Sequence, residues 1–139
     1  MILLDTSIIS ELVRAAPDPA VVDFLRQQRP DTVYTAAVCA AEIRYGLVRM
    51  PAGRRRDDLR ARMTALFAIA FQNEVLPFNS ECAGLYGQIR AYREAAGKPI
   101  TVEDAMIAAT ARAHGAVLAT RNLADFEDTG IQPVSPWTP

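Results

Sequence analysis

Short apolar runs alternate with longer segments of helical periodicity along the chain. The apolar runs have the length and the aliphatic or β-branched composition of buried strands, and they cover residues 2–4, 32–35, 75–78, 116–120 and 131–134. The longer segments carry apolar residues at helical spacing between proline, glycine or capping residues, and they cover residues 6–14, 18–28, 37–50, 52–72, 82–97, 102–114 and 122–128. The last apolar run is either a strand or an extended tail.

This alternation predicts an α/β fold in which helices cover both faces of a parallel sheet, with right-handed crossovers between the strands. No repeat, low-complexity tract or linker divides the sequence, so residues 1–139 are expected to form a single domain. Sites in such sheets form at the carboxyl ends of the strands, where the strand order reverses. Candidate chemistry is therefore expected at residues that directly follow a strand.

Two acidic residues occupy positions where chemistry is expected. Asp5 directly follows the first strand, where it either caps the next helix or belongs to a site. Glu42 lies in an apolar segment, and the alternatives are a functional carboxylate, a surface position or an ion pair with Arg44 or Arg49. An unpaired buried charge costs several kcal/mol, and this cost favours a functional role for Glu42.

Two more polar groups lie at corresponding positions later in the chain. Thr101, Glu103 and Asp104 fit a capping-box pattern at the start of an otherwise apolar helix, so one of the two acids is expected to point inward. Asn122 and Asp125 follow the apolar run at 116–120, where a helix cap and a site are both open interpretations.

A parallel sheet would bring all four of these groups to one edge. Two carboxylates about 4 Å apart repel by roughly 4 kcal/mol at an effective dielectric constant of about 20, so converging acids require a cation or shared protons. Oxygen ligands favour Mg²⁺ or Mn²⁺. Such ions activate water and neutralise phosphoryl charge in two-metal nucleases.

Charge and composition narrow the class of protein. The chain has 15 basic and 16 acidic residues and a net charge of −1, so any binding of nucleic acid must be local. The one basic cluster, at residues 54–62, mixes arginines with aspartates and is typical of a solvated helix face. Arg121, beside the candidate site, is the better phosphate contact. His114 is the one histidine, which argues against a zinc site, and it is assigned no catalytic role.

The remaining composition indicates a protein of the cytoplasm. Cys39 and Cys82 are sparse thiols of the kind found in reducing compartments. No apolar run approaches the roughly 18 residues of a membrane span, and the first residues carry no basic segment of a signal peptide. We therefore expect cytoplasmic localisation and no membrane partner.

Four short segments in a particular order resemble a known family across the whole chain. They are MILLDTS at 1–7, AEIRYG at 41–46, DAMIAATA at 104–111 and TRN at 120–122. Together they resemble the PIN-domain ribonucleases, specifically the VapC-type toxins of bacterial type II toxin–antitoxin systems in their FitB-like branch.

The resemblance implies a three-layer α/β/α fold with a central parallel, Rossmann-like sheet. It implies a toxic, Mg²⁺-dependent endoribonuclease, with Mn²⁺ able to substitute, in which Asp5, Glu42 and Asp104 are catalytic and bind metal. Thr6 would position this cluster or help to start its helix. The implied partners are RNA, a second copy of the chain, and a cognate VapB/FitA-like antitoxin encoded next to the gene, which occludes the site and carries the toxin–antitoxin assembly onto operator DNA.

One position departs from the family pattern. Family members often carry aspartate where this chain has Asn122, so a second metal would be held more weakly, or Asp125 would supply the missing charge. The alternative function is therefore a catalytically weakened PIN fold that acts as an interaction module. A haloacid-dehalogenase phosphatase is excluded because Ser7 stands where its second aspartate belongs, and a receiver domain because Lys98 precedes a helix rather than following a late strand.

Overall fold

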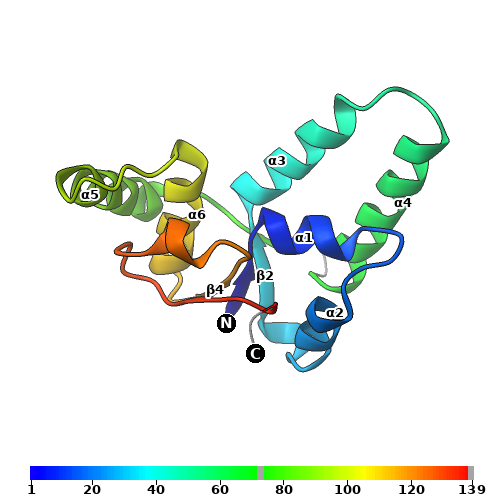
Figure 1. The fold of residues 1–139 in the computed structure, drawn as a ribbon, viewed down its shortest axis with the longest axis horizontal. Helices are drawn as coiled ribbons and strands as arrows, with labels where there is room; N and C mark the ends of the chain where they lie inside the picture. The colour runs from blue at the N-terminus through cyan, green and yellow to red at the C-terminus, as the bar shows by residue number, and fades with distance from the viewer. Residues whose placement is uncertain (72–73, 138–139) are drawn as a thin grey trace.

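The centre of the fold is a five-stranded parallel sheet, seen in a computed structural model that describes residues 1–71 and 74–137 (Figure 1). Its strands are β1 (Ile2–Leu4), β2 (Val33–Ala36), β3 (Val75–Leu76), β4 (Val117–Ala119) and β5 (Pro133–Val134). They lie in the order β3-β2-β1-β4-β5, and every neighbouring pair is parallel. The chain thus builds outward from β1 to β3 and then returns to add β4 on the other side of β1. The strand order reverses between β1 and β4.

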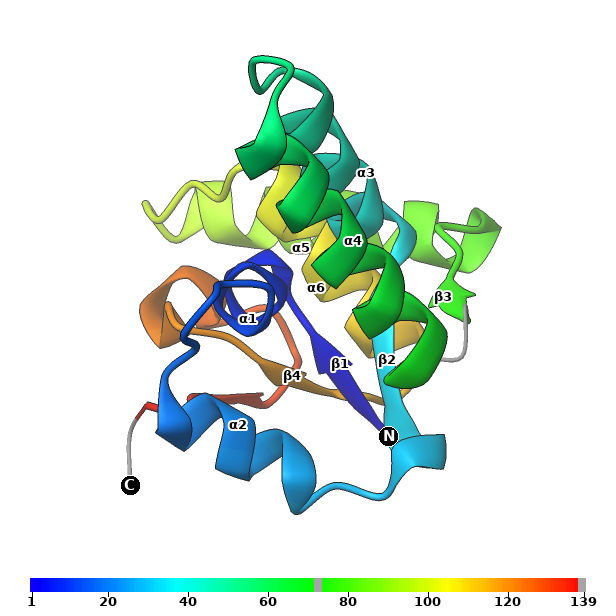
Figure 2. The same cartoon turned by 90° about the vertical axis from the view of Figure 1, so that its right-hand side faces the viewer.

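Helices cover both faces of the sheet and make three layers. They are α1 (Thr6–Leu12), α2 (Pro19–Arg26), α3 (Ala37–Val48), α4 (Arg54–Ile69), α5 (Ser80–Ala95) and α6 (Val102–Ala113). Figure 1 shows α5 and α6 on one side of the sheet and α1, α2 and α4 on the other, and Figure 2 shows α4 running beside α3 as a hairpin. No helix in the described parts of the chain has the length and hydropathy needed to span a bilayer. The predicted three-layer α/β/α architecture is confirmed.

The core lies between the sheet and its helices. Leu3 and Leu4 of β1 and Leu118 of β4 are fully buried, as expected for the central strands of a parallel sheet. Helix α6 presents a run of fully buried alanines to this core: Ala105, Ala108, Ala109 and Ala111. Because an alanine side chain is a single methyl group, α6 can pack closely against the sheet and carry its first turn to the strand ends.

The predicted elements are present, with differences at their ends. The second strand is shifted by one residue, to Val33–Ala36, because a 3₁₀ turn at Pro30–Thr32 precedes it. Strand β3 has two residues instead of four, since Pro77 follows it and has no N–H for a sheet hydrogen bond. The predicted helix at 52–72 forms over Arg54–Ile69, with its last predicted residue outside the described ones, and the short helix at 122–128 is a 3₁₀ turn, Leu123–Phe126.

The close packing of α6 leads to a stability prediction. Ala108→Leu adds volume to a fully packed site, so we expect it to lower the free energy of unfolding by about 1–3 kcal/mol. Ala61→Leu, on the exposed face of α4, is the matched control and should change stability by less than about 0.5 kcal/mol. Urea unfolding followed by circular dichroism measures both. Equal stability of the two variants would contradict tight packing of α6.

Candidate functional site

Asp5 lies at the point where the strand order reverses. It follows β1, and its backbone N–H donates to the carbonyl of Ala119 in β4 at 3.1 Å. The side chain is 5% exposed, and its Oδ1 accepts hydrogen bonds from the backbone N–H groups of Ser7 at 2.9 Å and Ile8 at 3.3 Å. The helix-cap interpretation is therefore confirmed. The same carboxylate also lies at the edge where a site is expected, so the two interpretations are compatible.

Two hydroxyl groups orient the Asp5 carboxylate. The Ser7 hydroxyl donates to Oδ1, and the Thr120 hydroxyl, 115 positions away in the sequence, donates to Oδ2 at 2.5 Å. In turn, the Ser7 oxygen accepts from the backbone N–H of Arg121 at 3.0 Å, and the Thr120 oxygen accepts from that of Asn122 at 3.2 Å. Sequence reasoning assigned no such role to Ser7 or Thr120. The one signal available was their position beside Asp5 and at the end of a strand.

Glu42 lies on α3 and is half-buried. Its Oε1 and the Oγ1 of Thr6 are both shielded from solvent and have no hydrogen-bond partner among the described residues. The ion-pair alternative is not observed, because no basic nitrogen among those residues lies within 4.0 Å of the Glu42 carboxylate. Among the described residues, Glu42 Oε1 is therefore a buried oxygen without a partner in direct hydrogen-bond geometry, and such an oxygen is costly for folding.

Asp104 is in the first turn of α6. The Thr101 side chain accepts a hydrogen bond from the Asp104 backbone N–H at 3.1 Å, so the predicted cap is present. Asp104 is half-buried and Glu103 is exposed, which identifies Asp104 as the acid that points inward. Asn122 stands at the N-cap position of the 3₁₀ turn but makes no side-chain cap hydrogen bond, so the cap interpretation of this residue is not supported.

The acidic side chains share one electrostatic environment. Burial is the main cause that raises the pKa of Asp5, Glu42 and Asp104 above the usual range of a carboxyl group. For Glu42, the next causes that raise its pKa are the charges of Glu103, Asp104 and Asp5. For Asp104, the charges of Asp125, Asp5 and Glu103 also raise its pKa. Carboxylates from the β1 end, α3, α6 and the 3₁₀ turn are thus close enough to repel one another.

The donor chemistry of this cluster fits a hard divalent cation. Within residues 1–71 and 74–137, no three or more acidic, histidine or cysteine side chains are arranged to hold a metal ion. The oxygen donors are nevertheless those that Mg²⁺ and Mn²⁺ prefer, and Glu42 Oε1 lacks any partner. A cation would supply that partner and offset the mutual repulsion of the carboxylates.

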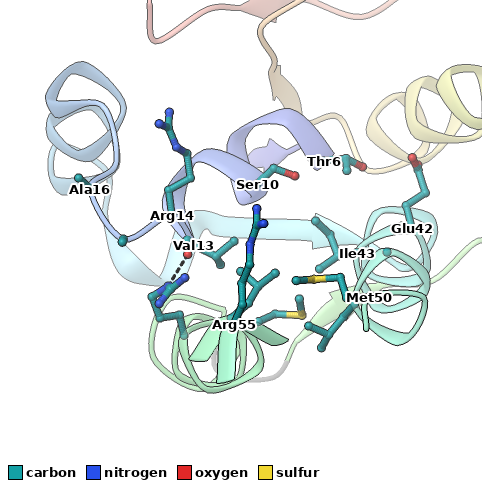
Figure 3. Close-up of a pocket in the computed structure, with 15 residues that line it drawn as sticks. Thr6, Ser10, Val13, Arg14, Ala16, Glu42, Ile43, Met50 and Arg55 are labelled. Atoms are coloured by element: carbon teal, nitrogen blue, oxygen red, sulfur yellow. Dashed lines mark hydrogen bonds between the residues drawn. The ribbon is translucent and has the colours of Figure 1, made fainter. Parts of the chain in front are cut away.

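A cleft leads away from the acidic cluster between α1, α3 and α4. Its volume is about 610 Å³. Figure 3 shows Thr6 and Glu42 at one end of this cleft and Arg14 and Ala16 at the other, with Arg55 between them. Its walls are largely apolar and include Val13, Ile43, Leu47, Leu59 and Met63. The cleft is therefore an apolar hollow that opens at the acidic cluster.

Comparison with known proteins gives a consistent result. The PIN domain family matches residues 2–131. VapC ribonuclease Y4jK of Sinorhizobium fredii is 42% identical over 139 residues, which is all of this chain and 99% of the relative. Toxin FitB of Neisseria gonorrhoeae is 36% identical over 137 residues, 99% of each chain. The structure of FitAB bound to the IR36 DNA fragment superimposes with a TM-score of 0.90 at 37% identity, over 99% of this chain and 96% of that one.

The fold makes this chain an α/β protein with a parallel sheet. Its acidic residues gather at the carboxyl ends of the strands, where the strand order reverses. The chain belongs to the PIN-domain family. Over nearly its full length it is similar to proteins named VapC and FitB. PIN-domain ribonucleases are generally metal-dependent enzymes.

The raised pKa of Asp104 predicts a pH-dependent effect on stability. A carboxyl group whose pKa is raised in the folded state favours folding only while it is protonated, and this contribution is lost as the pH rises above about 4. Asp104→Asn removes the charge, so at pH 7 in chelator it should raise the melting temperature by roughly 2–5 °C. The gain should disappear below about pH 4.

Thermal unfolding followed by circular dichroism measures this effect. The control is Asp23→Asn, which changes an exposed acid of α2 and should not shift the melting temperature appreciably. A melting temperature of Asp104→Asn at or below that of the unchanged protein at pH 7 would show that the Asp104 charge does not oppose folding.

Proposed function

We propose that this protein is the toxin of a type II toxin–antitoxin pair, a cytoplasmic, Mg²⁺-dependent endoribonuclease that hydrolyses RNA phosphodiester bonds. The observation that carries the proposal is the cluster of the buried Asp5 and the half-buried Glu42 and Asp104 carboxylates at the strand-order reversal, all three with raised pKa values. Membership of the PIN-domain family and the ribonuclease names of the relatives support it.

Asp5, Glu42 and Asp104 would hold the cation through carboxylate oxygens. The chemistry that Mg²⁺ or Mn²⁺ supplies in such a site is activation of water and neutralisation of charge on the phosphoryl group. Asp125 would supply the fourth acidic charge, because its charge already raises the pKa of Asp104. Asn122 would instead hold the loop through its backbone N–H, which donates to Thr120.

The protein's own residues prepare this site in two ways. Ser7 and Thr120 each donate a hydroxyl hydrogen bond to Asp5, and these bonds fix the direction of its carboxylate before any ligand binds. Glu42 is half-buried beside the other carboxylates and would help to orient the attacking hydroxide. Thr6 lies at the same end of the cleft, and its hydroxyl would orient that hydroxide or a phosphate oxygen.

Loss of the Asp104 or the Glu42 carboxylate should abolish most RNA cleavage. We expect Asp104→Asn and Glu42→Gln each to lower the cleavage rate of a structured RNA in Mg²⁺ by at least about 100-fold. Glu81→Gln, an exposed acid in the first turn of α5, is the matched control and should retain full activity. A chelator should abolish cleavage by the unchanged protein. Cleavage that survives the chelator or Asp104→Asn would refute a metal-dependent site, and no cleavage by the unchanged protein would favour the interaction-module alternative.

The proposed antitoxin would dock in the cleft between α1, α3 and α4. The cleft is apolar along its walls and ends at Thr6 and Glu42, so a bound segment would block access to the acidic cluster. FitAB has been solved on DNA. By analogy, the complex of this toxin with its antitoxin would bind operator DNA through the antitoxin, with the toxin present as a homodimer.

A larger side chain in the cleft should prevent neutralisation by the antitoxin without removing toxicity. Expression of the unchanged protein alone should arrest growth, and co-expression of the neighbouring reading frame should rescue it. Gly46 lines the cleft, and a Cβ atom built there meets no atom within 4 Å, so Gly46→Gln should fold, remain toxic and lose rescue. Gly84→Gln, at an equally open position on α5, should remain rescued. Full rescue of Gly46→Gln would place the antitoxin elsewhere.

A further inference from the structure

Glu11 is a buried acid that lies outside the acidic cluster. It is on α1, one turn after Ser7, and its side chain is 5% exposed. Its carboxylate accepts hydrogen bonds from Arg14 at 3.1 and 3.2 Å and from the backbone N–H of Asp18 at 3.0 Å. A guanidinium nitrogen of Arg121 lies 3.6 Å from the same carboxylate. Burying a carboxylate is costly unless cations and N–H groups surround it, and here two arginines do so.

Arg121 is held in place from three directions. Its guanidinium carbon lies 4.1 Å from the centre of the Trp137 ring, which places a cation over an aromatic face. Its side chain reaches Glu11, and its backbone N–H donates to the hydroxyl of Ser7. Contacts of this kind reduce the conformational entropy that a long arginine side chain would lose on binding a ligand.

Both arginines remain accessible despite these contacts. The Arg121 side chain is 55% exposed and that of Arg14 is 65% exposed. Both approach the same oxygen of Glu11, Arg14 at 3.2 Å and Arg121 at 3.6 Å. Two cations share one carboxylate, which leaves the group with a net charge of +1. Because Thr120 both precedes Arg121 and donates to Asp5, Arg121 is the member of this group that lies on the side of the acidic cluster.

We propose that Arg14 and Arg121, held together by Glu11, form a subsite for a backbone phosphate of the RNA, away from the phosphate that is cleaved. Guanidinium groups donate two N–H bonds to a phosphate in one plane, which suits fixed and half-exposed arginines. The inference rests on the proposed ribonuclease function. A purely structural role is the alternative. In that role the two arginines would neutralise Glu11 but would have no effect on the salt dependence of RNA binding.

Binding of RNA in the absence of cleavage tests the subsite. The protein would carry Asp104→Asn and be kept in chelator, with a fluorescently labelled single-stranded RNA followed by anisotropy at several salt concentrations. Each phosphate contact to single-stranded nucleic acid contributes about 0.7 to the slope of log K against log salt. We expect Arg121→Gln and Arg14→Gln each to lower this slope by about that amount and to weaken binding at least about threefold.

Matched controls separate the subsite from general charge and from folding. Arg26→Gln removes an exposed arginine of α2 and should leave the slope unchanged. Arg14 makes no hydrogen bond to the loop at Thr120, so its variant tests the subsite even if Arg121→Gln disturbs that loop. Trp137 is the one tryptophan in the chain, and its fluorescence should change when RNA binds beside Arg121.

The outcomes distinguish this inference from the proposed function. An unchanged slope in both Arg121→Gln and Arg14→Gln overturns the subsite, even if the unchanged protein cleaves RNA in Mg²⁺. If the slope of log K against log salt decreases in these two variants and not in Arg26→Gln, the subsite is supported. If the unchanged protein then fails to cleave, the ribonuclease proposal fails while the RNA-binding subsite stands. No binding of RNA by the Asp104→Asn protein at low salt also overturns the subsite.

Discussion

The carboxylate of Asp5 joins parts of the fold that are far apart in the sequence. One oxygen accepts the N–H groups that begin α1, and the other accepts the Thr120 hydroxyl at the end of β4. Burial raises the pKa of this group, so the hydrogen bonds from Ser7 and Thr120 are what make its charged form tolerable inside the protein. The ends of the central strands, and the acids beside them, depend on this one buried side chain.

Helix α1 then connects the parts of the candidate site, although it has only seven residues. Thr6 and Ser10 face the cleft toward α3 and α4, whereas Ser7 and Glu11 face the loop that follows β4. This division follows from helical geometry, since residues three or four apart share a face. One short helix that Asp5 caps therefore contributes residues both to the cleft and to the group around Glu11.

The distribution of charge explains how a nearly neutral protein can act on RNA. The net charge is −1, but without Asp5, Glu42 and Asp104 the remaining residues sum to +2. Burial raises the pKa values of all three acids, and the charges of neighbouring acids raise those of Glu42 and Asp104 further. The structure also holds Arg14 and Arg121 around Glu11. Local arrangement, and not total charge, determines where an anion can approach.

The sequence by itself determined the layers, the parallel sheet and the Thr101 cap, because these depend on periodicity and on neighbours within one turn. It also identified Asp5, Glu42 and Asp104 as candidates, since each stands beside apolar sequence. Only the tertiary structure decided that Thr120 bonds Asp5 and that Trp137 covers Arg121. Those contacts depend on strand order and on the return path of the chain, and neither leaves a local pattern in the sequence.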